Sequence, residues 1–145
     1  MKTLKLFRKC IVLGAFFLSG IMLKAQIVVE VTNIQSVEGN IFYGLYDDPE
    51  VYLELDKQFR VDAIPVKSLN MVFIIDEIPA GIYALSLFHD LNGDDVMQKN
   101  FFGYPKEPFG FSQNYRPTFR APKFSESQFE YDGHYIKIVI ELNDQ

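Results

Sequence analysis

Cysteine, histidine and tryptophan are the side chains that this sequence lacks or has least of. The 145 residues include one cysteine, two histidines and no tryptophan. The cysteine, Cys10, lies near the N-terminus, so the chain that follows it can form no disulfide. Zinc sites usually combine several His and Cys ligands, and His89 and His134 supply one pair at most. The composition therefore argues against a disulfide framework and against a zinc site.

Basic side chains are also scarce beyond the first 25 residues. All 19 acidic residues but only nine of the 14 basic residues follow residue 25, so the net charge changes from −5 for the whole chain to −10. Nucleic-acid phosphates and anionic lipid headgroups both require Lys and Arg. No glycine-rich phosphate loop is present either. The acidic balance argues against nucleic acid and against electrostatic docking on anionic lipid, and it permits cation binding.

The first 25 residues have the pattern of a secretory signal peptide. Four basic residues and no acidic residue precede an apolar run from Ile11 to Leu23, and Ala25 then precedes Gln26. This run has 13 residues, whereas a membrane-spanning helix needs about 20. The pattern predicts a signal peptide over residues 1–25 rather than a retained anchor. We therefore expect an exported protein with no membrane insertion after signal removal.

Residues 26–145 are predicted to form a single all-β domain. Apolar and polar residues alternate over short segments separated by turn residues, and no segment has a long 3.6-residue period. This spacing predicts an antiparallel β-sandwich of about seven strands. We expect a hairpin between the first two strands around Gly39 and an irregular connection over residues 49–67. The strands identified by their alternation are 26–34, 41–46, 69–75, 82–88 and 135–142.

Residues 89–124 differ from the rest of the chain. After a polar start they contain frequent aromatic residues interrupted by prolines. Prolines this frequent exclude a regular strand or helix, and aromatics this frequent argue against disorder. We predict a long, ordered loop whose aromatics in residues 100–124 pack on one end of the sandwich. The rings would either stack on one another, which is the commoner use, or form a sugar-binding platform, which the absence of tryptophan disfavours.

Oxygen-bearing side chains alternate at the start of this loop, as in a calcium-binding loop. Three of them occupy positions one, three and five, with a backbone carbonyl at seven and an amide at nine. Position twelve is Phe101, so the bidentate carboxylate of an EF-hand is missing. The alternative is a purely structural turn rich in Asp, Asn and Gly, in which Asp90 accepts backbone N–H bonds. The candidate calcium ligands are Asp90, Asn92, Asp94, Val96 and Gln98.

The same region permits a hydrolase-like site, with His89 and Asp90 beside Ser86 or Ser112. No nucleophile motif accompanies these residues, and a histidine that hydrogen-bonds the loop in place is the simpler interpretation. A deep polar pocket joining His89, Asp90 and Glu107 would favour an enzyme. Side chains tied to the backbone would favour a non-catalytic binding module, which we prefer. The candidate ligand-binding residues are His89, Asp90, Asn92, Glu107 and Ser112.

The block from His89 to Ser112 resembles the hallmark of a bacterial family called domain of unknown function 2141. Members of this family are small exported proteins, and the resemblance covers most of residues 26–142. It implies an immunoglobulin-like or transthyretin-like sandwich with no established activity. The residues that carry it are His89-Asp90-x-Asn92, Asn100-x-Phe102-Gly103-x-Pro105-Lys106-Glu107-Pro108-x-Gly110-Phe111-Ser112, Ile78-Pro79-Ala80-Gly81-x-Tyr83-Ala84 and Pro122-x-Phe124.

The chain departs from the family pattern at two places in the loop. Asp94-Asp95 stands where Asn-Gly is usual, and Gln98 stands where Asp is usual, so one candidate ligand is weakened while another is added. The Lys24-Ala25-Gln26 junction resembles those of secreted proteins from Bacteroidetes. That resemblance implies a periplasmic or extracellular location in a Gram-negative cell, where the partner would be a protein or a carbohydrate of the cell envelope.

Overall fold

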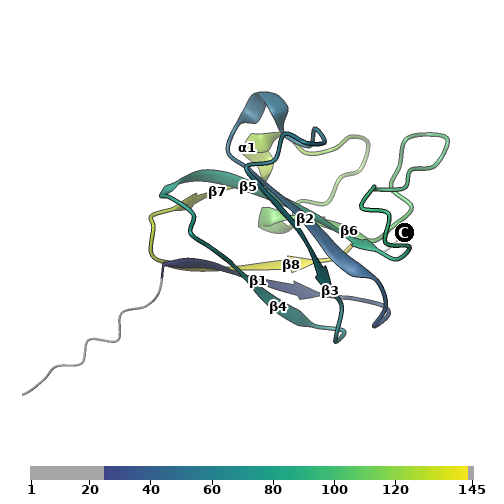
Figure 1. Ribbon diagram of the computed structural model, residues 1–145. Coiled ribbons are helices and arrows are strands. Elements are labelled where there is room, and N and C mark those ends of the chain that lie inside the picture. Colours follow the sequence, from purple (N-terminus) through teal and green to yellow (C-terminus); the bar gives the residue numbers. More distant parts are fainter. Residues whose placement is uncertain (1–24, 144–145) are drawn as a thin grey trace, which may run out of the picture.

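The computed structural model describes residues 25–143, which form an all-β arrangement of two sheets (Figure 1). The described residues contain eight strands and one four-residue helix, α1 (Phe124–Ser127). The predicted signal peptide lies outside them, apart from its last residue, Ala25. Between residues 25 and 143 no helix has the length and apolar character needed to cross a membrane.

The first strand is the centre of a three-stranded sheet. β1 (Gln26–Thr32) pairs antiparallel with β4 (Met71–Asp76) on one side and parallel with β8 (Tyr135–Glu141) on the other. Its alternate residues Ile27 and Val29 are fully buried, as the period-two pattern predicts. The pairing shows that the predicted hairpin between the first two strands is wrong, because the turn at Gly39 carries the chain from one sheet to the other.

The second sheet is built on β5 (Gly81–Asp90). One edge of β5 pairs with β2 (Asn40–Tyr46), which in turn pairs with β3 (Arg60–Pro65). The other edge pairs first with β7 (Gln128–Tyr131) and then with β6 (Phe109–Phe111). The prediction of an irregular connection over 49–67 is therefore wrong for β3. This edge strand lacks a clear burial alternation, and a short 3₁₀ turn, η1 (Pro49–Val51), precedes it.

One apolar core lies between the two sheets, which is the arrangement of a β-sandwich. Tyr43 of β2 and Phe73 of β4 stack across it with ring centroids 4.9 Å apart. β6 approaches β8 so closely that a Cβ on Gly110 would lie 2.5 Å from Cγ2 of Ile140. The largest fully buried apolar side chains are Ile27, Val29, Val31, Ile41, Leu45, Ile75, Leu85, Tyr131, Ile140 and Leu142.

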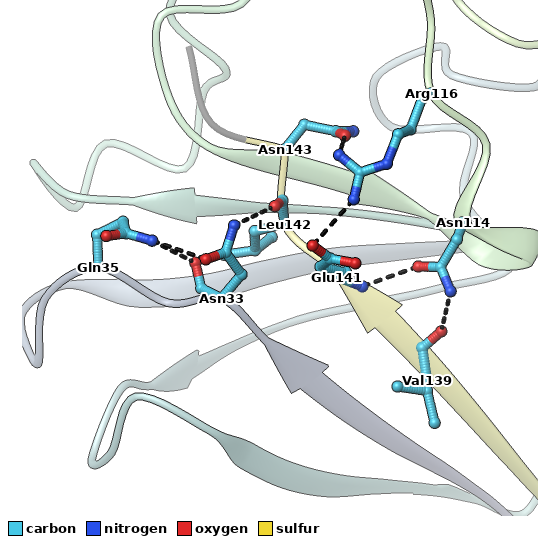
Figure 2. A network of polar contacts seen from close by, with 8 residues as sticks. All are labelled: Asn33, Gln35, Asn114, Arg116, Val139, Glu141, Leu142 and Asn143. Carbon is cyan, nitrogen blue, oxygen red and sulfur yellow. Dashed lines mark hydrogen bonds and ion pairs between the residues drawn. The ribbon is translucent and has the colours of Figure 1, made fainter.

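The free edge of β8 is covered by the segment that follows β6 (Figure 2). The Asn114 amide donates to the carbonyl of Val139 at 3.1 Å and accepts from the N–H of Glu141 at 2.8 Å. One side chain thus pairs with the strand edge as a strand residue would, which protects the edge from another chain. Arg116 continues the contact with bonds to Asn143 at 2.6 Å and to Glu141 at 3.0 Å.

The long segment 89–124 contains more regular structure than predicted. It begins inside β5 and includes β6 and a 3₁₀ turn, η2 (Ser112–Asn114). Its phenylalanine residues divide into two sets. Phe109, Phe111 and Phe124 are buried, whereas Phe101, Phe102 and Phe119 are 98%, 90% and 100% exposed. The predicted packing of the aromatics is therefore confirmed for the first set and wrong for the second. Phe109 and Phe111 lie against Phe42 and Phe88, and Phe124 lies against Tyr46 and Ala84. These contacts are on the outer face of the five-stranded sheet and not on one end of the sandwich.

Candidate functional site

Two buried carboxylates organise the start of the long loop. Asp90 is fully buried, and its two oxygens accept backbone N–H bonds from Gly93 at 2.7 Å and Asp95 at 2.9 Å. Glu107 is 5% exposed and accepts from the N–H groups of Leu91 at 3.2 Å and Gln98 at 3.1 Å. Four backbone donors of residues 91–98 are satisfied in this way, so both carboxylates act as structural clamps.

The other candidate calcium ligands lie on the exposed side of the same loop. Asp94 accepts from the amides of Asn92 at 3.0 Å and Gln98 at 2.7 Å, and from the N–H of Val96 at 3.0 Å. The Val96 bond is the main cause that lowers the pKa of Asp94 below its usual value. Residues 25–143 contain no group of three or more His, Cys, Asp or Glu side chains placed to hold a metal. The calcium site stays a prediction, and the observed bonds are those of the alternative structural turn.

The candidate histidine is separated from the two carboxylates. His89 is 1% exposed, and its Nε2 lies 2.7 Å from the carbonyl of Glu38. A carbonyl only accepts, so Nε2 carries the proton, and Nδ1 has no partner among the described residues. Successive residues of a strand point to opposite faces, which places His89 on the core side of β5 and Asp90 on the outer side. No bond joins His89, Asp90 and Glu107 within residues 25–143.

Ser112, the remaining candidate, is a buried connector. Its hydroxyl accepts the N–H of Leu85 at 2.9 Å and bonds the carbonyl of Ser127. It therefore ties β5, η2 and the end of α1 together. A catalytic nucleophile is accessible and lies next to a general base. The Ser112 side chain is instead fully buried, and all of its hydrogen-bond partners are backbone groups.

A pocket that the sequence did not indicate lies over the outer face of the five-stranded sheet. It has a volume of about 200 Å³. Its floor comes from β2 and β5, and its walls come from residues 53–58 and 96–111. We call this the aromatic pocket. The side chains that dominate its lining are Phe42, Tyr46, Leu53, Phe88, Met97, Phe109 and Phe111.

A few polar groups are placed around these rings. Ser86 and Gln58 lie at the floor and wall, and Lys99 lies at the rim. Burial raises the pKa of the Tyr46 hydroxyl, and hydrogen bonds from Ser86 and Gln58 partly oppose that shift. Lys99 is exposed and forms no ion pair with any residue between 25 and 143. An apolar cavity with a small number of polar groups is the usual form of a small-molecule site.

The floor of the aromatic pocket depends on a residue without a side chain. A Cβ on Gly44 would lie 2.9 Å from Cγ of Gln58 and 3.0 Å from the ring of Tyr46. The sequence did carry one relevant signal. β2 is apolar on both faces, with burial from Tyr43 through Tyr46. A strand that is apolar on both faces is covered on both faces, and the segments that cover this one form the pocket.

The fold and the pocket define an all-β protein of two sheets with a concave, aromatic-lined site on the outer face of one sheet. The chain belongs to the DUF2141 family, described as an uncharacterized protein conserved in bacteria, whose family model matches residues 29–138. This match confirms the family resemblance of the His89–Ser112 block. No curated protein and no solved structure matches the chain.

Proposed function

We propose that this protein is an exported, non-catalytic binding module whose ligand occupies the aromatic pocket. The observation that carries the proposal is the cavity of about 200 Å³, walled by aromatic rings from β2, β5 and β6 and open to solvent. Residues 53–58 and 96–111 form its sides, and their contacts with the sheet support the shape of the pocket. A pre-formed cavity of this kind binds without a large ordering cost.

The lining specifies the chemistry of the ligand. Phe42, Phe88 and Phe109 offer ring faces and edges to an apolar or planar group. Lys99 at the rim supplies a cation with no protein partner among the described residues. We therefore infer a small ligand with an apolar body and an acidic end. Ser86 and Gln58 would hydrogen-bond a polar substituent carried by that body.

We also propose that the protein is not an enzyme. It is supported by the partners of His89, Asp90 and Glu107, whose bonded side-chain atoms all contact backbone groups. These bonds serve loop structure, and none of the three side chains lines the aromatic pocket. A hydrolase would require an accessible nucleophile next to a base, and Ser112 is fully buried.

We further propose that the protein is exported and that its sandwich is of the immunoglobulin-like or transthyretin-like type. The apolar run of residues 11–23 supports removal of the leader, and sheets of three and five strands around one core support an immunoglobulin-like or transthyretin-like sandwich. Mass spectrometry of the exported protein is expected to find an N-terminus at or near Gln26. An intact Met1 in the membrane fraction would contradict export with cleavage.

Ligand binding can be tested with a fluorinated phenylalkanoic acid as the probe, observed by ¹⁹F NMR. We expect binding to wild-type protein and at least about ten-fold weaker binding to Ser86→Phe, because the new ring fills the floor. Ile74→Phe is the matched control. It adds a ring of the same size on the outer face of the other sheet, where Ile74 is 53% exposed, and it should leave binding unchanged.

The role of Lys99 is tested by pairing the acid with the corresponding alcohol. Lys99→Met should weaken the acid and leave the alcohol almost unaffected, since only the carboxylate gains from the cation. Equal binding of the probe by wild type and Ser86→Phe would show that the aromatic pocket is not the ligand site. Equal loss for acid and alcohol would show that Lys99 acts by packing and not by charge.

A further inference from the structure

Three phenylalanine side chains project from two neighbouring loops. Phe101, Phe102 and Phe119 are 98%, 90% and 100% exposed. Phe102 and Phe119 line a second pocket of about 180 Å³ beside the aromatic pocket, and the rings of Phe101 and Phe102 are 5.5 Å apart, edge to face. We call these three side chains the phenylalanine tips. Single exposed apolar residues are ordinary, but an apolar cluster of this size on a small domain marks an interaction surface.

A well-defined hairpin holds two of the tips at its apex. The N–H of Gly103 bonds the carbonyl of Asn100 at 2.9 Å, so Phe101 and Phe102 occupy the two central positions of the turn. The Asn100 side chain accepts the N–H groups of Phe102 at 2.9 Å and Tyr104 at 3.0 Å. Central turn positions usually hold Gly, Pro, Asn, Asp or Ser. The backbone does not require phenylalanine at either position, and both rings are left in solvent.

The surroundings of the tips are basic, although the chain is acidic. Residues 99–123 contain five of the nine basic residues that follow residue 25, and their one acid, Glu107, is buried. Arg116 and Arg120 pair with Glu141 and Glu126, whereas the three lysines of this range form no ion pair among residues 25–143. The range has a formal net charge of +4, and of +2 once the two ion-pair partners Glu126 and Glu141 are included. The unpaired lysines are Lys99, Lys106 and Lys123.

We propose that the phenylalanine tips dock the protein on an anionic lipid surface. The rings would enter the boundary between headgroups and acyl chains, and the lysines would contact the headgroups. Paired apolar and basic elements are what reversible interfacial binding requires. The overall negative charge does not prevent this, because salt screens charges beyond about 8 Å at physiological ionic strength. The charges nearest the tips, such as that of Lys99 beside Phe102, therefore matter more than the overall charge.

The nature of the tips favours lipid over a sugar or a peptide partner. Phenylalanine carries no polar atom with which to bond a sugar hydroxyl or a peptide group. Phe101 and Phe102 meet edge to face at 85°, so they form a wedge and not a flat stacking platform. The three rings act separately from the ligand of the aromatic pocket, since Phe101, Phe102 and Phe119 do not line that pocket, whereas Lys99 borders both sites.

The absence of tryptophan allows a direct test in the exported protein. Phe102→Trp introduces the only tryptophan of the chain at the hairpin apex, and Val72→Trp introduces one on the outer face of the three-stranded sheet, where Val72 is 59% exposed. With vesicles of phosphatidylcholine and phosphatidylglycerol, emission from residue 102 should shift to shorter wavelength and be quenched by spin-labelled acyl chains. Emission from residue 72 should not change. A shift at both positions, or at neither, would overturn the proposal.

Vesicle co-sedimentation tests the two elements separately. Replacing all three tips by serine should reduce association by about ten-fold or more, as expected for losing several buried rings. Lys106→Glu with Lys123→Glu should remove the preference for anionic over neutral vesicles, whereas the control pair Lys57→Glu and Lys67→Glu should not. The triple-serine variant should keep its urea midpoint and its affinity for the fluorinated acid. Undiminished vesicle binding by that variant, or capture only by a soluble acidic protein, would rule the lipid surface out.

Discussion

The two halves of the long loop are ordered by different forces. Residues 90–98 contain one partly buried apolar side chain packed on the core, Met97, and are held by hydrogen bonds from four backbone N–H groups to Asp90 and Glu107. Residues 100–124 are held by burying Phe109, Phe111 and Phe124 against the sheet, while three other phenylalanines remain in solvent. The comparison shows that aromatic content alone does not predict burial, and that a polar loop can be fixed as firmly as an apolar one.

The largest expected effect contrasts two phenylalanines of the second half. Phe111→Ala should lower the free energy of unfolding by about 3–5 kcal/mol, because it removes a buried ring and leaves a cavity. Phe119→Ala should change it by less than about 0.5 kcal/mol, because that ring is fully exposed. Urea denaturation measures both. Similar losses for the two variants would mean that Phe119 is packed in solution and that the division into buried and exposed rings fails.

The next largest effect is expected in the first half. Glu107→Gln keeps the size of the side chain but replaces one acceptor oxygen by an amide that faces an N–H group. The loss should be about 1–3 kcal/mol, the cost of leaving a buried donor without a partner. Glu130→Gln, at an exposed position of β7, is the matched control. If Glu107→Gln proves neutral, the carboxylate is not the clamp of residues 91–98.

The sequence predicted some elements well because their information is local. The alternating residues of β1, β4 and β8 marked those strands to within a few positions. The pairing of β1 with β4 and β8 is non-local, and no short pattern encodes it, so the nearer β2 was taken as the partner. β3 was missed because an edge strand with both faces partly exposed has no clear alternation.

The candidate site, too, could be predicted from the sequence only where its information is local. The polar residues of the family block were recognisable as special, and the structure finds His89, Asp90, Glu107 and Ser112 all buried. Their role as backbone acceptors and connectors follows only from three-dimensional contacts. The aromatic pocket was missed because its lining comes from separate segments of the chain, each of which looks like ordinary core. Concavity is a property of the assembled loops and not of any one of them.

A smaller effect is expected from the ion pair between Arg120 and Glu126 near the end of the second half. The Arg120 guanidinium bonds Glu126 at 2.7 and 2.8 Å and, with the N–H of Lys123, lowers the pKa of Glu126 from 4.5 to about 2. A lowered folded-state pKa stabilises the fold above the unfolded value, and that contribution is lost as the pH falls from about 4.5 towards 2. Because the pair is exposed, salt should weaken it.

Melting curves of wild type and Glu126→Gln measure this contribution. Wild type should be slightly more stable at neutral pH, and the two curves should converge at the acid end of that window. Glu130 has no ion pair among residues 25–143, so Glu130→Gln is the control. The stability difference between this variant and wild type should not contain the pH-dependent contribution of the Arg120–Glu126 pair. A wild-type advantage that persists unchanged at the lowest pH would place the role of Glu126 in packing and not in its charge.

The smallest expected effect is that of calcium on the first half of the loop. Each oxygen of Asp90 already accepts a backbone N–H, and Asp94 accepts bonds from Val96, Asn92 and Gln98. A calcium ion would have to compete with these bonds, and position twelve supplies no carboxylate. A ligand at one hundred times its dissociation constant adds about 2.7 kcal/mol, which would raise the melting temperature by several degrees.

We therefore expect equal melting temperatures in millimolar calcium, in magnesium and in chelator. Asp94→Ala is the appropriate variant, because Asp94 is exposed and its loss should leave the fold intact. A rise that is specific for calcium and disappears in Asp94→Ala would establish the metal site predicted from the spacing of Asp90, Asn92 and Asp94. It would also change the comparison between the two halves, since the first would then be held by an ion in addition to its buried carboxylates. Without such a rise, hydrogen bonds to the backbone are sufficient to account for its order.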